Sequence, residues 1–142
     1  MSGRIVRRAT PGDLARLVEL GLRFYREEGG REASPATLAR FAASHVLDEA
    51  CVCLVGGDPV AACLCGMIAP HYLTGEPTAF KTSWYALPGS RGFGAHLLKA
   101  FEAWAMQKGA RRIIVAGRRD RTLTLLERLH YQPLETVYAK DL

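Results

Sequence analysis

Hydrophobic and polar residues alternate along this chain with two different periods, which predict an ordered series of strands and helices. Apolar residues three and four positions apart form one stripe of an amphipathic helix, whereas short apolar runs bounded by turn residues are typical of strands. The spacing predicts helices at residues 11–28, 35–42, 94–108 and 122–129. The short apolar runs predict strands at residues 5–8, 51–55, 60–68, 79–87, 113–116 and 134–140.

Local start and stop signals support the ends of these elements. Thr10-Pro11-Gly12-Asp13 supplies a hydroxyl cap, a proline in the first turn and a carboxylate three residues after the cap. Ser34-Pro35 repeats the start signal, and Gly29-Gly30 is expected to end the first helix. Gly109 stands where a left-handed residue commonly ends a helix. Gly56-Gly57-Asp58-Pro59 separates two strands and predicts a hairpin.

The resulting order is β-α-α-β-β-β-α-β-α-β, with no internal repeat and no linker. A meander of strands combined with helices predicts an α/β fold with a mixed, mostly antiparallel sheet and helices on its faces. The 142 residues are expected to form a single domain, 1–142, that buries a core without disulfides or metal.

The composition of the chain indicates which class of protein this domain belongs to and where it is expected to be located. A hydrophobic fraction of 49% and a charged fraction of 23% are ordinary for a soluble globular protein. No apolar run approaches the roughly 20 residues that cross a bilayer, and the first residues lack a signal peptide, so we expect a cytoplasmic protein without a membrane partner. The net charge of +5 would attract anions, but no run of like charges is long enough for a nucleic-acid-binding arm.

The four cysteines occur as Cys51-Val52-Cys53 and Cys63-Leu64-Cys65. Residues two apart on a strand share a face, so each pair points to one side of the expected hairpin. A zinc site is one alternative, but structural zinc sites prefer two to four residues between ligands. We therefore expect buried thiols that pack in the core, and no metal.

The segment Arg91-Gly92-Phe93-Gly94-Ala95, which links a strand to the longest helix, carries the main chemical signal. The first turn of a helix presents unpaired N–H groups and a partial positive charge. Glycine lets such a backbone approach a bulky anion, and Arg91 adds a charged donor. This arrangement suits a phosphate or diphosphate, although an ordinary strand-to-helix turn is the alternative.

Three segments in this order resemble the GNAT superfamily of N-acetyltransferases, and the resemblance covers nearly the whole chain. They are the opening residues 5–14, the Pro88-to-Gly94 loop that enters the long helix, and residues 125–133 before the last strand. The closing residues 135–140 are similar to endings found in phage-type or prophage-borne members.

The resemblance implies that two middle strands splay apart and hold acetyl-CoA in a slot. Backbone groups of Tyr85, Ala86 and Leu87 would pair with the pantetheine arm, and the diphosphate would rest on the loop that includes Ser90, Arg91, Gly92, Phe93, Gly94 and Ala95. The implied activity is acetyl transfer from acetyl-CoA to an amine of a small molecule or a protein. An exposed last strand also suggests a homodimer.

Departures from the family pattern concern acid–base catalysis. Leu126 stands where members often have a tyrosine acid, Lys81 where many have a glutamate base, and Arg119 where an asparagine is common. The substitutes that we consider are Glu76 and His71 as bases and Tyr131 as an acid.

Two alternatives to an active acetyltransferase therefore remain. One is an acyl-CoA-binding module that has lost its catalytic activity. The other is a basic protein associated with nucleic acid.

Overall fold

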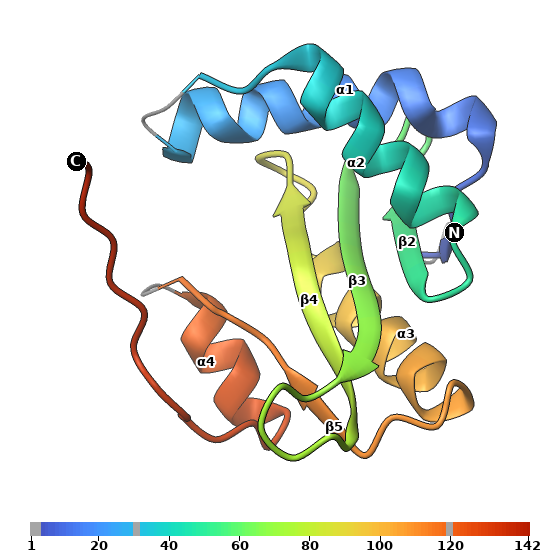
Figure 1. Cartoon of the computed structure of the whole chain (residues 1–142). Helices are drawn as coiled ribbons and strands as arrows, with labels where there is room; N and C mark the ends of the chain where they lie inside the picture. The colour runs from blue at the N-terminus through green and yellow to red at the C-terminus, as the bar shows by residue number, and fades with distance from the viewer. Residues whose placement is uncertain (1–3, 30–31, 119–120) are drawn as a thin grey trace.

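The computed structural model describes residues 4–29, 32–118 and 121–142. The strands are β1 (Val6–Arg8), β2 (Cys51–Gly56), β3 (Ala62–Pro70), β4 (Pro77–Ala86) and β5 (Arg112–Ile114) (Figure 1). The helical elements are η1 (Pro11–Asp13), α1 (Leu14–Phe24), its π-helical continuation η2 (Tyr25–Gly29), α2 (Pro35–Leu47), α3 (Phe93–Gln107) and α4 (Arg121–Arg128). Gly30 and Arg119, which enter the sequence predictions, lie outside the described residues.

Capping contacts explain where several of these elements begin and end. The backbone N–H of Thr10 donates to the Asp13 carboxylate at 2.8 Å, and Arg7 of β1 binds the same carboxylate at 2.8 Å. The Ser34 hydroxyl accepts from the backbone N–H of Thr37 at the start of α2. Gly109 follows α3 with a φ of 83°, which confirms the predicted left-handed stop.

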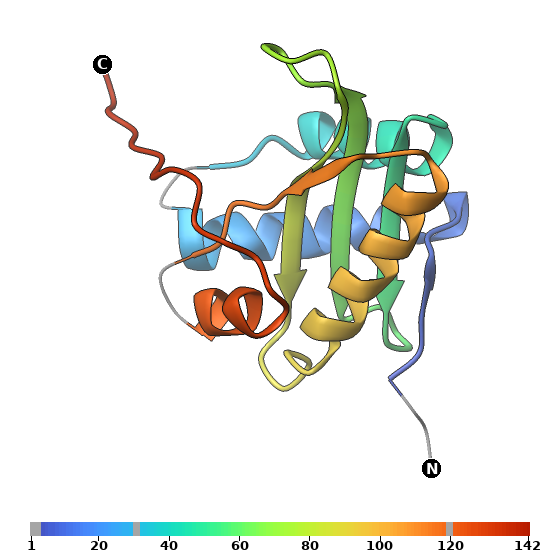
Figure 2. The same cartoon turned by 90° about the horizontal axis from the view of Figure 1, so that it is seen from below.

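The five strands form one mixed sheet in the order β1-β2-β3-β4-β5. Neighbouring strands are antiparallel except for β4 and β5, which are parallel. Helices α1 and α2 cover one face of this sheet and α3 covers the other, with α4 beside it, as the second view shows (Figure 2). The predicted mixed α/β fold with helices on both faces is confirmed.

The alternation of side chains along β2 and β3 divides the core into two apolar clusters. Val52, Leu54 and Leu64 face α3, where Phe101 is fully buried. Cys53, Val55, Cys63 and Cys65 face α1 and α2. The thiols are thus buried core residues, and the Sγ atoms of Cys53 and Cys65 lie 3.4 Å apart.

Strand β4 changes its pairing halfway along its length. Its residues 78–80 pair with β3 on one side and with β5 on the other, but β5 ends at Ile114 and leaves residues 81–86 without a partner on that side. A β-bulge also shifts the register between β3 and β4, because Cys65 pairs with Ser83 while the next residue, Gly66, pairs with Lys81. The expected splaying of the middle strands is therefore present, and it opens beside the second half of β4.

The predicted final strand at residues 134–140 is wrong for the single chain. This segment has no strand pairing, runs away from the body of the molecule (Figure 1), and exposes Leu134, Val137 and Tyr138. A period-2 pattern makes a segment fit for pairing but does not supply a partner. The nearest sheet edge, β5, is only three residues long and offers few backbone groups. The other predicted strands and helices are present, with shifted ends.

Candidate functional site

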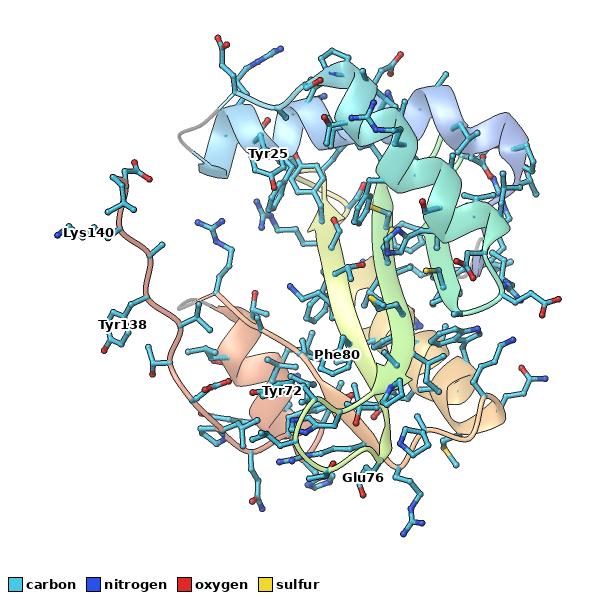
Figure 3. The ribbon with its side chains drawn as sticks, in the orientation of Figure 1. Tyr25, Tyr72, Glu76, Phe80, Tyr138 and Lys140 are labelled. Atoms are coloured by element: carbon cyan, nitrogen blue, oxygen red, sulfur yellow. The ribbon has the colours of Figure 1, made fainter. Side chains whose placement is uncertain are left out.

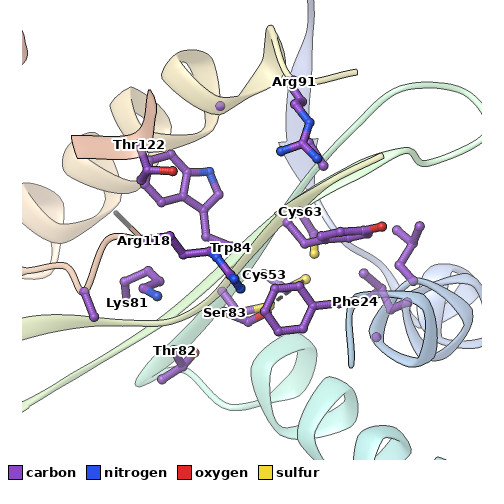
Figure 4. Close-up of a pocket in the computed structure, with 18 of the residues that line it drawn as sticks. Phe24, Cys53, Cys63, Lys81, Thr82, Ser83, Trp84, Arg91, Arg118 and Thr122 are labelled. Atoms are coloured by element: carbon purple, nitrogen blue, oxygen red, sulfur yellow. Dashed lines mark hydrogen bonds between the residues drawn. The ribbon is translucent and has the colours of Figure 1, made fainter. Parts of the chain in front are cut away.

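A cavity of about 510 Å³ lies where β4 has lost its partner (Figure 4). Residues 81–86 of β4 form its floor, and Ala116 and Arg118 continue from β5 on the far side of the gap. Helix α4 contributes Thr122, Leu125 and Arg128 on that side. On the other side the walls come from the facing residues of α1 and α2, which include Leu20, Phe24, Leu38 and Phe41.

The free edge of β4 offers backbone hydrogen-bonding groups to this cavity. The N–H of Leu87 donates to Ala61 O at 2.9 Å, on the β3 side. Successive residues of an antiparallel strand direct their backbone groups to opposite sides, so Tyr85 also faces β3 whereas Trp84 and Ala86 face the gap. The structure therefore favours Trp84 and Ala86, rather than Tyr85 and Leu87, for backbone contact with an extended ligand.

The N-terminus of α3 closes one end of the cavity. Arg91, Gly92, Gly94 and Ala95 all line it, as the sequence predicts for an anion cradle. A Cβ atom at Gly94 would lie 3.7 Å from the Trp84 ring and 3.8 Å from Leu125, so a side chain there would narrow the entrance. Two amides of this turn already donate locally, because Phe93 N bonds to Ser90 O and Gly94 N to Arg91 O, each at 3.1 Å.

Arg4 adds a second cation to the cradle. Its guanidinium occupies the space where a Cβ at Gly92 would lie, so it rests directly on the glycine of the loop. At the level of sequence, Arg4 was considered only as part of the net charge of +5. Only the packing of the N-terminal strand beside α3 brings it to this position.

The charge of the cavity is positive. Lys81, Arg91, Arg118 and Arg128 line it, and its described lining includes neither aspartate nor glutamate. Burial lowers the pKa of Lys81, because removing water disfavours the charged ammonium. A group of cations without carboxylates suits an anionic ligand and leaves the site without the usual carboxylate base.

The opposite wall, formed by α1, α2 and the thiols, is mostly apolar. Phe24 packs edge-to-face on Tyr85 with ring centroids 5.3 Å apart, and the Tyr85 hydroxyl donates to Glu27 at 2.9 Å. The hydrogen bond to Cys53 raises the pKa of Cys65, and burial raises it further, so this thiol stays protonated. These side chains shape a pocket more than they supply charge.

One polar contact crosses this wall. The hydroxyl oxygen of Thr82 lies 2.8 Å from Nε2 of His45, a buried residue of α2. Thr82 lines the cavity and is the extra residue of the β4 bulge, since its neighbours Lys81 and Ser83 are the ones that pair with β3.

A slot beside an unpaired strand edge, a glycine turn at a helix N-terminus and a cationic lining together resemble an acyl-CoA site, and a comparison of sequences agrees. The model of the acetyltransferase (GNAT) family matches residues 14–131. The chain belongs to this family. A search among curated proteins found no match.

Solved structures confirm that the chain has the fold of this family. A transcriptional regulator from Bacillus halodurans C-125 superposes with a TM-score of 0.82 at 20% identity, covering 99% of this chain and 100% of that one. A predicted acetyltransferase with acetyl-CoA from Clostridium acetobutylicum has a TM-score of 0.78 at 18% identity, covering 98% and 96%. AAC(6')-Iy in complex with a bisubstrate analogue, CoA-S-monomethyl-acetylneamine, has a TM-score of 0.74 at 18% identity, covering 99% and 100%.

The three acid–base substitutes chosen from the sequence do not line the cavity. His71 and Glu76 sit in the β3–β4 turn, where Nδ1 of His71 accepts from the backbone N–H of Leu73. Figure 3 shows Glu76 at the opposite end of β4 from Tyr25, a residue of the cavity wall. Tyr131 donates to Glu102 of α3 at 3.2 Å, outside the cavity. Their catalytic roles stay predictions without support from the geometry of the cavity.

Burial determines the protonation of Tyr131 and the packing of Leu126. Burial and the nearby charge of Glu102 raise the pKa of Tyr131, so its phenol keeps its proton. Leu126, which occupies the position of the usual acid, is buried in the cluster around α3.

Sequence reasoning missed Trp84, Thr82, His45 and Arg4 as candidates. They share no motif, and Arg4, His45 and the two β4 residues come from separate parts of the chain. The local signal was the run of three polar residues, Lys81-Thr82-Ser83, between apolar residues of the predicted strand.

Proposed function

We propose that this acetyltransferase transfers the acetyl group of acetyl-CoA to an amine. The observation that supports this most directly is the cavity between the unpaired edge of β4 and the N-terminus of α3. An extended pantetheine arm needs backbone partners along its length, and Trp84 and Ala86 present such groups to the gap.

The residues at the other end of the cavity fit the diphosphate of this co-substrate. Gly94 leaves the turn open to a bulky group, while Arg91 and Arg4, whose guanidinium occupies the space beside Gly92, supply positive charge. The partial positive charge of the α3 N-terminus also favours binding of the diphosphate. Acetyl-CoA, a tetra-anion, is thus matched by cations at the phosphate end and by a narrow strand edge at the thioester end.

The reaction that follows is direct transfer. The lone pair of a neutral amine attacks the thioester carbon, the C–S bond breaks, and CoA leaves as a thiolate. Holding both reactants in one cavity supplies much of the rate, since the attack becomes effectively intramolecular. The acceptor enters from the side of α1 and α2, where Phe24, Tyr25 and Phe41 form an apolar wall.

Two measurements, made one after the other, test this function. Isothermal titration should show that acetyl-CoA and CoA bind, and thiol release from acetyl-CoA across a panel of amines should show turnover. Binding without thiol release for any amine would favour the binding module that lacks activity. Failure to bind acetyl-CoA, together with retention on DNA at physiological salt, would favour the nucleic-acid alternative, because purely phosphate-driven binding weakens steeply with salt.

A homodimer is a second part of the proposal, and the exposed C-terminal segment supports it. Residues 134–140 keep a strand-like sequence but pair with no strand among the described residues. A second copy offers the same segment, and the two segments would pair with each other across a dimer axis. Light scattering of the full chain and of a chain ending at Pro133 would test whether this segment holds two copies together.

A further inference from the structure

The ring of His45 is held in one orientation by a contact within its own helix. Its Nδ1 lies 2.9 Å from the carbonyl oxygen of Phe41, one turn earlier in α2, and the two rings are in contact, with centroids 4.0 Å apart and planes tilted by 31°. A carbonyl oxygen only accepts, so Nδ1 carries the hydrogen. In the neutral ring Nε2 then holds a lone pair, and the bond at 2.8 Å to Thr82 is one in which the threonine hydroxyl donates.

The position of Thr82 makes this hydroxyl part of the cavity as well as a partner of the ring. As the extra residue of the bulge it has no partner on β3, and bulges commonly redirect a side chain next to an active site. Its side chain reaches α2, 37 residues away in sequence, while the residue itself stays exposed to the cavity. The hydroxyl oxygen keeps lone pairs that can accept a hydrogen from a molecule bound there.

The cavity otherwise has few groups that can take a proton. Its described lining has no carboxylate, and the bond to Cys53 keeps Cys65 protonated. The other titratable side chains on this part of β4 are Lys81, an amine, and Tyr85, whose hydroxyl already donates to Glu27. Here a hydroxyl is hydrogen-bonded to an imidazole whose other nitrogen is held by a third group. Proteins use this arrangement to take a proton from a hydroxyl or to relay one through it.

We propose that Thr82 and His45 form the proton relay of this acetyltransferase, with His45 as the final acceptor of the proton of the incoming ammonium group. The inference rests on the proposed acetyl transfer and names the base that this reaction requires. Figure 4 shows Thr82 on the α2 side of β4 and Lys81 and Arg118 on the side of the gap, so acceptor and co-substrate would approach the strand from different directions.

The proton balance of the relay is simple. An N–H proton of the ammonium moves to the Thr82 oxygen while the Thr82 proton moves to Nε2 of His45, which leaves a neutral amine and an imidazolium. The amine lone pair then attacks the thioester carbon and the C–S bond breaks. The imidazolium returns its proton through Thr82 to the thiolate, and the second proton lost by the nitrogen leaves to water.

Three variants separate this role from a merely structural hydrogen bond. His45→Gln keeps an amide that can bond to Thr82 but cannot take a proton. Thr82→Val removes the hydroxyl at nearly constant shape, and Thr82→Ser restores it. Both His45→Gln and Thr82→Val are expected to lower kcat by about 100-fold, the usual size of a general-base contribution. Thr82→Ser should keep most of the wild-type kcat.

The affinity for acetyl-CoA, measured by titration, is expected to stay unchanged in all three variants, and thermal unfolding checks that each is folded. Full activity of His45→Gln, or equal losses in Thr82→Val and Thr82→Ser, would overturn the relay. An acetyl group found by mass spectrometry on Thr82 would also overturn it, because the hydroxyl would then be a nucleophile.

The nitrogen chemical shifts of the His45 ring give a test that does not need turnover. The relay requires hydrogen on Nδ1 and a free Nε2, and a ring protonated on Nε2 instead would contradict it. The two proposals also fail differently. A wild-type protein that releases no thiol removes acetyl transfer and relay together, whereas an active wild type with equally active variants removes the relay alone.

Discussion

The two halves of β4 differ in one respect, the presence of a second neighbour, and this difference creates the site. Residues 78–80 lie between β3 and β5, and both Thr78 and Ala79 are fully buried. Residues 81–86 keep β3 but have lost β5, and each of them lines the cavity. In a strand paired on both sides the backbone N–H and C=O groups are hydrogen-bonded within the sheet, whereas at an unpaired edge they can bind a ligand.

The largest expected effect is a loss of acetyl-CoA affinity, caused by a substitution at the N-terminus of α3 beside the unpaired half of β4. Gly92→Asp places a carboxylate at the α3 N-terminus, where it repels the diphosphate, and should weaken acetyl-CoA binding by about 100-fold, or about 3 kcal/mol. The fold should persist, since a new Cβ meets only the end of the flexible Arg4 side chain. Titration calorimetry measures the loss. Gly12→Asp, the same change at an exposed turn, is the control and should bind normally.

If Gly92→Asp bound acetyl-CoA as tightly as the wild type, the diphosphate would not lie on this turn. The unpaired half of β4 would then need another role.

The next effect belongs to the paired half. Ala79→Leu adds bulk at a fully buried position between β3 and β5 and should lower the free energy of unfolding by about 2 kcal/mol. Urea denaturation measures this change. The affinity of the folded protein for acetyl-CoA should change little, because residue 79 does not line the cavity. A loss of affinity without loss of stability would mean that the two halves are not separate in function.

The same substitution in the open half should have the reverse effect. Ala86→Leu fills space beside the unpaired edge and is expected to lower acetyl-CoA affinity by about tenfold, or about 1.4 kcal/mol. Its effect on urea denaturation should be smaller than that of Ala79→Leu, because Ala86 is only partly buried. Equal destabilisation by the two leucines would argue that the gap is as tightly packed as the paired half.

The smallest effect lies at the far edge of the sheet. Asp13 caps η1 and binds Arg7, and this hydrogen bond with Arg7 lowers the pKa of Asp13 from 3.8 to about 2. Asp13→Asn should therefore cost about 1 kcal/mol of stability at neutral pH without changing acetyl-CoA binding. A carboxyl with a depressed pKa stabilises the fold above its ordinary pKa and loses this contribution as pH falls through the folded value.

Urea denaturation at several pH values tests this prediction. The difference in stability between wild type and Asp13→Asn should shrink between about pH 4 and pH 2. A difference that stays constant down to pH 2 would show that the carboxylate charge is not what stabilises the contact.

Some parts of the site could be predicted from the sequence because their cause is local. The turn at Gly92 and Gly94 lines the cavity as expected, and the neighbouring Arg91 does too. Backbone contacts with the ligand were predicted for Tyr85, Ala86 and Leu87, whereas the pairing of β4 leaves the backbone groups of Trp84 and Ala86 facing the gap. The direction of a backbone N–H depends on which neighbour pairs with it, and a single strand does not contain that information.

The sequence by itself determined the order of strands and helices, the capped start near Thr10, the stop at Gly109 and the open turn at α3, because each depends on residues within one turn of one another. The tertiary structure decided where β5 ends and which side of β4 lacks a neighbouring strand. It also decided that residues 134–140 pair with no strand in the part of the chain that is described, and that Thr82 meets His45 from 37 residues away. These features depend on contacts between distant segments, whose geometry is fixed only when the sheet and its helices pack together.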